Sequence, residues 1–232
     1  MAFALAIMAP IVMPAGTAPP SLPLAEILRQ MDEHDHAMSD SLIRYTCERR
    51  YTLQNKRFKK KAEIRVRMTY SSPGHKTFEV LSEQGPSVIR QRVLRPMLAA
   101  EEQASQDDIR PHTRIVLKNY NFKLLGSAIQ EERPAYLLDL APKSRNKFLI
   151  SGRVWVDSQN FGVMRVEAVP AQNPSVFIHN TQIVQQSIRF DDLWLPSFIH
   201  SRTDSFLFGR TEVSIDSWDY RITRKPPSAP VL

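Results

Sequence analysis

The chain reads Tyr136-Leu137-Leu138-Asp139-Leu140-Ala141-Pro142-Lys143, then Gly152-Arg153-Val154-Trp155-Val156-Asp157, then Gly162-Val163-Met164-Arg165-Val166-Glu167. In these three runs apolar residues alternate with charged residues at a period of two, which is typical of half-buried β-strands rather than helices. Glycine and proline punctuate the runs where the chain must turn. The segment therefore predicts two consecutive antiparallel strand pairs.

The same kind of pattern recurs along most of the chain. Further strands are expected at residues 43–53, 62–71, 76–82, 119–125, 134–140, 152–156, 163–169, 181–190, 193–202 and 206–220, the last with a break at Gly209. About ten or eleven antiparallel strands at such regular spacing predict a sandwich or a barrel. A sheet of that size must curl, close or cover one of its faces.

Two helical stretches interrupt the strands in the first half of the chain. The first is expected from Leu24 to Ser39, after a proline-rich lead, because Leu24, Ile27, Leu28, Met31 and Met38 recur at helical spacing. The second follows Gly85-Pro86, and its expected inward face holds Ile89, Val93, Met97 and Ala100, with Val88 and Leu94 beside it.

Pro96 lies inside the second helical stretch, where we expect a kink or a break. The acidic residues 101–108 that follow are expected to form a solvated loop. These elements predict a mostly β (α+β) fold: a single curled antiparallel sheet, or unclosed β-barrel, with two helical segments covering its concave face. Residues 19–224 are the expected domain, and residues 225–232 are an expected flexible proline-rich tail.

Composition points to a basic protein with anionic partners. Of its 232 residues, 31 are Lys or Arg and 24 are Asp or Glu, giving a net charge of +7. This balance favours phospholipid headgroups, nucleic acid or an acidic protein face. Because the charge is spread through strands and turns, we read it as a general surface bias and expect no nucleic-acid partner. We expect a monomer.

The amino terminus predicts export. Residues 1–18 carry no charge, and the apolar run from Met1 to Met13 is followed by the small residues Ala15 to Ala18. This matches a signal peptide cleaved after Ala18, except that no Lys or Arg precedes the apolar region. Cys47 is the only cysteine, so the chain has no internal disulfide. It lies too far downstream for lipidation, which predicts a soluble periplasmic product.

The hairpin from Gly152 to Glu167 carries a family resemblance. Its Gly-x-Val-Trp-Val-Asp phrase and the following Arg165-x-Glu167 resemble the recurring "G-x-hydrophobic-W-hydrophobic-D … R-x-E" hairpin of the LolA/LolB-like superfamily. These are periplasmic carriers of lipoproteins and their relatives, and the chain is most similar to the outer-membrane lipoprotein-sorting protein branch. The order of elements agrees from Leu24 to Ile222.

The resemblance implies an unclosed barrel that encloses an apolar cavity, with helices as a lid and a lipid or acylated ligand inside. The lid and wall candidates are Val88, Ile89, Val93, Met97, Tyr120, Phe122, Leu124, Tyr136, Leu138, Val154, Val156, Phe206 and Phe208. The alternative for each of them is an ordinary place in a packed core. Periodicity alone leaves open whether Trp155 or its neighbours Val154 and Val156 face inward.

A basic turn separates the first two expected strands. It comprises Lys56, Arg57, Phe58, Lys59, Lys60 and Lys61. Such a turn fits docking on an anionic membrane or an acidic envelope protein, with Phe58 as a shallow anchor. The alternative is a solvated hairpin turn whose lysines resist aggregation.

The sequence shows no signature of catalysis or of a metal or cofactor site. His34 and His36 lie two residues apart on the first expected helix and do not share a face, unlike zinc-binding pairs. The leading hypothesis is an exported binding protein that carries or senses an acylated ligand, without catalytic residues, metal or cofactor. The alternative is a regulatory or scaffold module of the envelope that binds a protein partner.

Overall fold

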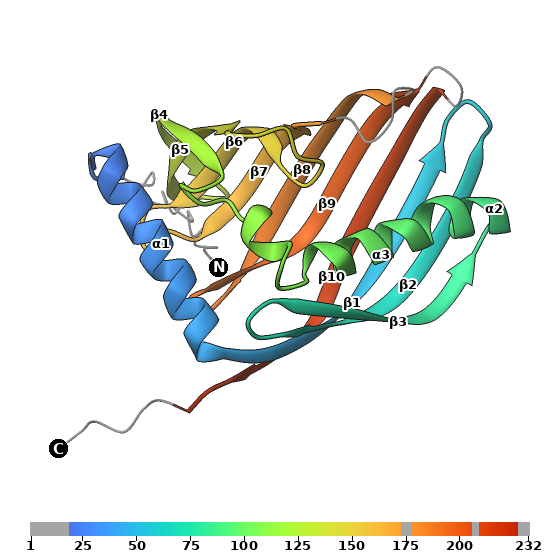
Figure 1. Ribbon diagram of the computed structural model, residues 1–232, viewed down its shortest axis with the longest axis horizontal. Coiled ribbons are helices and arrows are strands. Elements are labelled where there is room, and N and C mark those ends of the chain that lie inside the picture. Colours follow the sequence, from blue (N-terminus) through green and yellow to red (C-terminus); the bar gives the residue numbers. More distant parts are fainter. Residues whose placement is uncertain (1–18, 173–177, 206–208, 227–232) are drawn as a thin grey trace, which may run out of the picture.

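The computed structural model describes residues 19–172, 178–205 and 209–226. These residues form ten strands and two helical stretches (Figure 1). The helical elements are α1 (Leu24–Ser41), α2 (Ser87–Ile89), a π-helical turn (Arg90–Leu94), α3 (Arg95–Ala104) and a 3-10 turn (Arg110–His112). The strands are β1 (Leu42–Asn55), β2 (Lys60–Ser71), β3 (His75–Gln84), β4 (Tyr120–Gln130), β5 (Arg133–Pro142), β6 (Ile150–Asp157), β7 (Val163–Pro170), β8 (Ile178–Phe190), β9 (Leu193–Ser205) and β10 (Gly209–Arg224).

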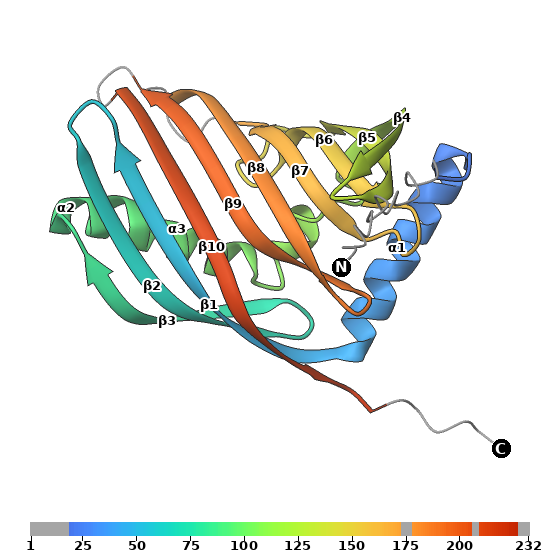
Figure 2. The same cartoon turned by 180° about the vertical axis from the view of Figure 1, so that it is seen from behind.

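All ten strands belong to one antiparallel sheet with the order β3-β2-β1-β10-β9-β8-β7-β6-β5-β4. The pairing of β1 with β10 joins the two halves of the chain, so β3 and β4 remain as edge strands. The sheet curls without closing, and both helical stretches lie on its concave side (Figure 1). The opposite face carries no helix (Figure 2). The unclosed sheet that the sequence predicted is confirmed.

The hairpin of β6 and β7 has the alternation expected from its sequence. Val154 and Val156 are fully buried on the concave side, whereas Trp155 is half-buried and lies under the guanidinium of Arg165, 5.8 Å from its ring centroid. This settles which residues of β6 face inward. Val154 and Val156 lie beneath α1, whereas Trp155 belongs to the outer face of the sheet.

The first helix has the predicted position and ends two residues later than expected, at Ser41. Its buried residues are Ile27, Leu28 and Met31, all in the amino-terminal half. They pack on buried side chains of β5, β6 and β7 and form the first core cluster. The carboxy-terminal half, residues 32–41, contains no fully buried side chain.

The second helical stretch runs as α2, the π turn and α3, and its buried face differs from the expected one. Val93 is 38% exposed, whereas Leu94 and Leu98 are buried against β1, β2 and β10 in the second core cluster. The physical reason is the π turn, which spaces inward residues five apart instead of four. The inward face therefore runs from Ile89 to Leu94 to Leu98. The expected break near Pro96 takes the form of this π turn, and Pro96 lies in the first turn of α3.

The acidic stretch after this helix differs from the expected solvated loop. Its first residues belong to α3, which continues to Ala104, and Glu101 is partly buried in an ion-pair network described below. The rest forms turns that lead to β4. In the ranges that the structure describes, no helix is long and apolar enough to cross a membrane.

Three of the sequence predictions fall outside the described residues. The predicted signal peptide, residues 1–18, is one of them. The wall candidates Phe206 and Phe208 are another, and residues 227–232 of the predicted tail are the third.

Candidate functional site

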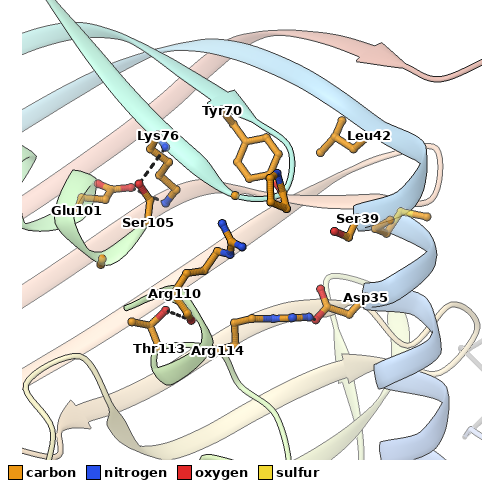
Figure 3. Close-up of a pocket in the computed structure, with 14 residues that line it drawn as sticks. Asp35, Ser39, Leu42, Tyr70, Lys76, Glu101, Ser105, Arg110, Thr113 and Arg114 are labelled. Carbon is orange, nitrogen blue, oxygen red and sulfur yellow. Dashed lines mark hydrogen bonds and ion pairs between the residues drawn. The ribbon is translucent and has the colours of Figure 1, made fainter. Parts of the chain in front are cut away.

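A cavity of about 310 Å³ lies where α1, α3 and the β2–β3 hairpin meet (Figure 3). We call it the interhelix cleft. Its lining residues come from α1, from β1 to β3, from α3 and from the segment that leads to β4: Asp35, Met38, Ser39, Leu42, Tyr70, Pro73, Gly74, Lys76, Glu101, Ala104, Ser105, Arg110, Thr113 and Arg114. The volume is at the lower end of the range for small-molecule pockets.

One side of the cleft is apolar and belongs to a third core cluster. Leu42 is buried there, and Met38 and Tyr70 are partly buried against it. Below them, Tyr45 stacks on Tyr70 with ring centroids 4.8 Å apart. The cleft thus opens above an apolar layer that neither α1 nor α3 covers with its buried face.

The opposite side of the cleft carries two arginines, each within ion-pair distance of an aspartate. Arg114 extends toward α1 and forms an ion pair with Asp35, while the guanidinium of Arg110 points toward Tyr70 (Figure 3). The side chain of Arg110 passes close to Gly74, where a β-carbon would lie 2.3 Å from Cδ of Arg110. Burial raises the pKa of Tyr70, and Asp35 raises it further, while Arg110 and Arg114 oppose the change. The phenol of Tyr70 is therefore neutral at physiological pH.

Glu101 ties α3 to the sheet at the edge of the cleft. Its carboxylate accepts hydrogen bonds from Arg49 Nη1 at 2.7 Å, Lys76 Nζ at 2.8 Å and the hydroxyl of Tyr51 at 2.9 Å. Arg49 is only 1% exposed. Burial alone would raise the pKa of Glu101, but Lys76 and Arg49 together hold it well below its ordinary value. Glu101 and Arg49 are therefore both charged at neutral pH.

Most of the predicted wall residues lie in the first core cluster, beneath α1. Tyr120, Tyr136, Leu138, Val154 and Val156 are at most 2% exposed. Phe122 and Leu124 pack against the same cluster and are partly buried. None of these seven residues lines the interhelix cleft.

The predicted lid residues divide into two pairs. Ile89 and Met97 are partly buried over the second core cluster. Val88 and Val93 are exposed on the solvent side of the same helical stretch. The structure therefore places the predicted lid over β1, β2 and β10, next to the cleft rather than across it.

Asp157, in the hairpin sequence that carries the family resemblance, has a structural role. Asp157 is fully buried, accepts a hydrogen bond from Arg133 Nε at 2.7 Å, and receives the backbone amides of Gln159 and Asn160 at 2.9 Å each. Burial would raise the pKa of Asp157, but these hydrogen bonds lower it. The aspartate thus caps the turn between β6 and β7.

The basic turn joins β1 to β2 at the end of these strands remote from the cleft. Residues 56–61 are all exposed, and Phe58 is 50% exposed. Lys56 forms an ion pair with Glu212 at 2.8 Å, and the guanidinium of Arg57 lies over the ring of Phe58. Lys59 has a positive φ of 49°, as tight turns require.

None of the residues that line the cleft was predicted from the sequence as a site residue. Arg49 offered a usable signal, since it alternates with Tyr45, Cys47 and Tyr51 on the inward side of β1. A charge at an inward position predicts a buried partner. Arg110 and Arg114 lie in an irregular segment, where no periodicity identifies the face of a side chain. Among the described residues, no group of three or more His, Cys, Asp and Glu is arranged to hold a metal ion.

Comparison with known proteins gives similarity of fold only. No protein-family model matches the sequence, and no curated protein matches it. A LolA superfamily protein from Nitrosomonas europaea shares 14% identity over 89% of this chain and 96% of its own, with a TM-score of 0.47. An outer membrane lipoprotein-sorting protein domain from Vibrio parahaemolyticus shares 9% identity over 88% and 95%, with a TM-score of 0.45.

A protein of the DUF1329 family from Desulfovibrio piger shares 14% identity over 87% of this chain and 94% of its own, with a TM-score of 0.44. All three structures have identities of 14% or less and TM-scores below 0.5. What the cleft does has to be argued from the residues of this chain.

Proposed function

We propose that this protein is an exported binding protein of the periplasm that carries or senses an acylated ligand, which enters the concave face through the interhelix cleft. The observation that carries the proposal is that the two helical stretches cover different parts of the concave face and leave a gap between them. The amino-terminal half of α1 packs on the first core cluster and the π turn with α3 packs on the second. The third cluster lies between them, under the cleft.

This arrangement supports an amphiphilic ligand. Met38, Leu42 and Tyr70 give the cleft an apolar side that continues into the third cluster. Each methylene that leaves water there contributes about 0.8 kcal/mol, so even part of an acyl chain is a strong driving force. The cleft volume of about 310 Å³ accommodates a headgroup and the start of a chain. A longer chain requires the carboxy-terminal half of α1 to move outward.

The experiment is to secrete the full chain into a bacterial periplasm, purify it without detergent, and identify bound lipid by native mass spectrometry and extraction. We expect about one acylated molecule per chain. Met38→Glu, which places a charge on the apolar side of the cleft, should abolish its retention. The matched control is Val93→Asp, an acidic substitution at an exposed apolar position on the other helical stretch. Equal retention of lipid by both variants would contradict the proposed entrance.

A second function is favoured by a different observation. The predicted wall residues are packed in a filled core, and the edge strand β3 exposes Val80 and Leu81 beside its open backbone edge. An open edge of this kind can pair with a strand of another protein. If the purified protein is free of lipid and takes up no fluorescent fatty acid, the better function is an envelope scaffold that binds a protein partner.

A further inference from the structure

We propose that the interhelix cleft recognises an oxyanion, a phosphate or carboxylate, at the head of the acyl chain. In this proposal Arg110 is a donor, and Arg114 exchanges its partner Asp35 for the ligand. The inference rests on the proposed function and names the chemical class of the ligand that the cleft takes.

Arg110 is positioned by the fold and retains donor capacity. Its side chain is 21% exposed and passes directly against Gly74, which has no side chain to obstruct it. Its buried Nη1 makes no hydrogen bond within the described structure. Asp107 Oδ1 lies 3.0 Å from this nitrogen, but without hydrogen-bond geometry, and the side chain of Asp107 is 68% exposed. A buried guanidinium nitrogen without an acceptor is costly, and a movement of the Arg110 side chain toward an anion in the cleft would relieve that cost.

Arg114 already holds a carboxylate on the other side of the cleft. It pairs with Asp35 of α1, and the two side chains are 38% and 50% exposed. An ion pair with this much exposure contributes little, so its replacement by another oxyanion costs little. A phosphate or carboxylate can accept parallel hydrogen bonds from guanidinium groups, whereas Asp35 now accepts one, from Nη2 of Arg114.

Within the described structure, the acidic neighbours of the two arginines are Asp107 and Asp35, whose side chains are 68% and 50% exposed. Glu101 is engaged by Arg49 and Lys76, and therefore does not neutralise Arg110 or Arg114. The hydroxyls of Thr113 and Ser105 donate to the carbonyls of Arg110 and Glu102, at 2.9 Å and 2.6 Å. The cleft thus offers guanidinium donors on one side and the apolar residues Met38, Leu42 and Tyr70 on the other.

Partner exchange at Arg114 would also loosen α1. For residues 32–39, the polar ties to other elements within the described structure are the Asp35–Arg114 ion pair and a hydrogen bond from Ser72 Oγ to the carbonyl of Ser39, at 3.3 Å. If the ligand takes Arg114, only the hydrogen bond to the carbonyl of Ser39 remains for residues 32–39. Binding of the anionic head would then make an outward movement of these residues modestly easier and help to admit the chain.

The experiment measures binding of three probes to the delipidated full chain by isothermal titration calorimetry. The probes are monodecyl phosphate, uncharged decyl maltoside and inorganic phosphate, all below micelle-forming concentrations. We expect monodecyl phosphate to bind at least tenfold more tightly than either of the others. Arg110→Gln and Arg114→Gln should each weaken its binding about tenfold, because a hydrogen bond to a charged group is lost. Arg221→Gln, at a 77% exposed position, is the matched control and should change nothing.

Asp35→Asn gives a test that unfolding cannot imitate. Removing the internal competitor should tighten binding of monodecyl phosphate several-fold, and should speed amide hydrogen exchange in residues 36–41 without ligand. Unchanged or weaker binding by this variant would overturn the exchange at Arg114.

The three probes also separate the possible failures. Equal binding of decyl maltoside and monodecyl phosphate would overturn the oxyanion inference and leave the proposed function intact. Equal binding of inorganic phosphate and monodecyl phosphate would show a site for the free anion and overturn the headgroup assignment. Binding of none of the three would contradict the proposed function itself.

Discussion

Arg49 is a charged residue that is almost completely buried. It lies in the inward row of β1, between the buried side chains of Cys47 and Tyr51. An isolated charge there would cost many kcal/mol, so the fold supplies Glu101 from α3 at 2.7 Å. Burial likewise raises the pKa of Cys47, so that its thiol is protonated and unreactive at neutral pH. The charge of Arg49 on β1 thus holds α3 to the sheet through Glu101.

The first prediction concerns the removal of the Glu101 charge. Glu101→Gln leaves the buried guanidinium of Arg49 without a counter-charge, and should lower the free energy of unfolding by about 3 kcal/mol. Urea denaturation followed by circular dichroism measures this change. The control is Glu48→Gln, whose partner Arg65 is 45% exposed, and for which we expect less than about 1 kcal/mol. Similar losses in the two variants would show that the Glu101 network does not anchor α3.

The second prediction is a pH dependence of the same group. The pKa of Glu101 in the folded protein lies below its ordinary value of 4.5, so its contribution to stability is fully present above about pH 4.5. As pH falls below that value, the unfolded state takes up the proton first and the contribution is progressively lost. The difference in stability between the native protein and Glu101→Gln should therefore be constant from pH 7 to pH 5 and shrink below pH 4.5. A difference that stays constant to pH 3 would contradict the assignment.

At the scale of elements, the β6–β7 hairpin depends on a glycine at its start. Gly152 has a φ of +155°, and a β-carbon there would lie 2.1 Å from the carbonyl oxygen of Glu167 and 2.6 Å from Cα of Ala168. Both are backbone atoms of β7, so they cannot move aside without separating the strands. This close approach explains why the phrase that predicted the hairpin begins with glycine.

The third prediction follows from this geometry. Gly152→Ala should lower the free energy of unfolding by about 3 kcal/mol or more, because strain at this φ adds to a backbone clash. Gly126→Ala is the matched control, because Gly126 also has a positive φ, +141°, but open space where the β-carbon would go. It should cost about 1 kcal/mol. Equal losses in thermal or urea unfolding would show that the close approach between β6 and β7 contributes nothing.

At the scale of the whole molecule, the cleft and the basic turn lie at opposite ends of β2. This strand has 12 residues and begins at the turn, and at about 3.3 Å per residue it spans about 40 Å. The sheet therefore separates a surface suited to anionic partners from a cavity suited to an amphiphile. A protein docked through residues 56–61 would hold its cleft away from the surface on which it rests.

The fourth prediction tests docking on membranes. Vesicles that contain phosphatidylglycerol should carry the protein upward in a flotation gradient, and vesicles of phosphatidylcholine alone should not. Added salt should reduce this binding, and the triple variant with Gln at Lys59, Lys60 and Lys61 should abolish it. The control removes three other exposed charges, those of Lys143, Arg145 and Lys147, and should leave flotation unchanged. Flotation that persists in the first triple variant would contradict docking through the turn.

The sequence by itself determined the elements of this protein. Strand alternation depends on a period of two and helix faces on a period of 3.6, and both are local properties that the order of residues records. The strand runs and the helix that begins at Leu24 were therefore predictable from periodicity, whereas the unclosed sheet was expected from the family resemblance. The inward face of the second helical stretch was not, because a π turn changes its spacing.

The tertiary structure alone decided what lies at the candidate site. Gly74, Arg110 and Arg114 come from a turn and an irregular segment, where side-chain direction follows from packing rather than from periodicity. Asp35 joins them from α1 only because the sheet curls and brings the two helical stretches toward each other. Periodicity records which side of an element is apolar, but only the folded arrangement sets which elements meet.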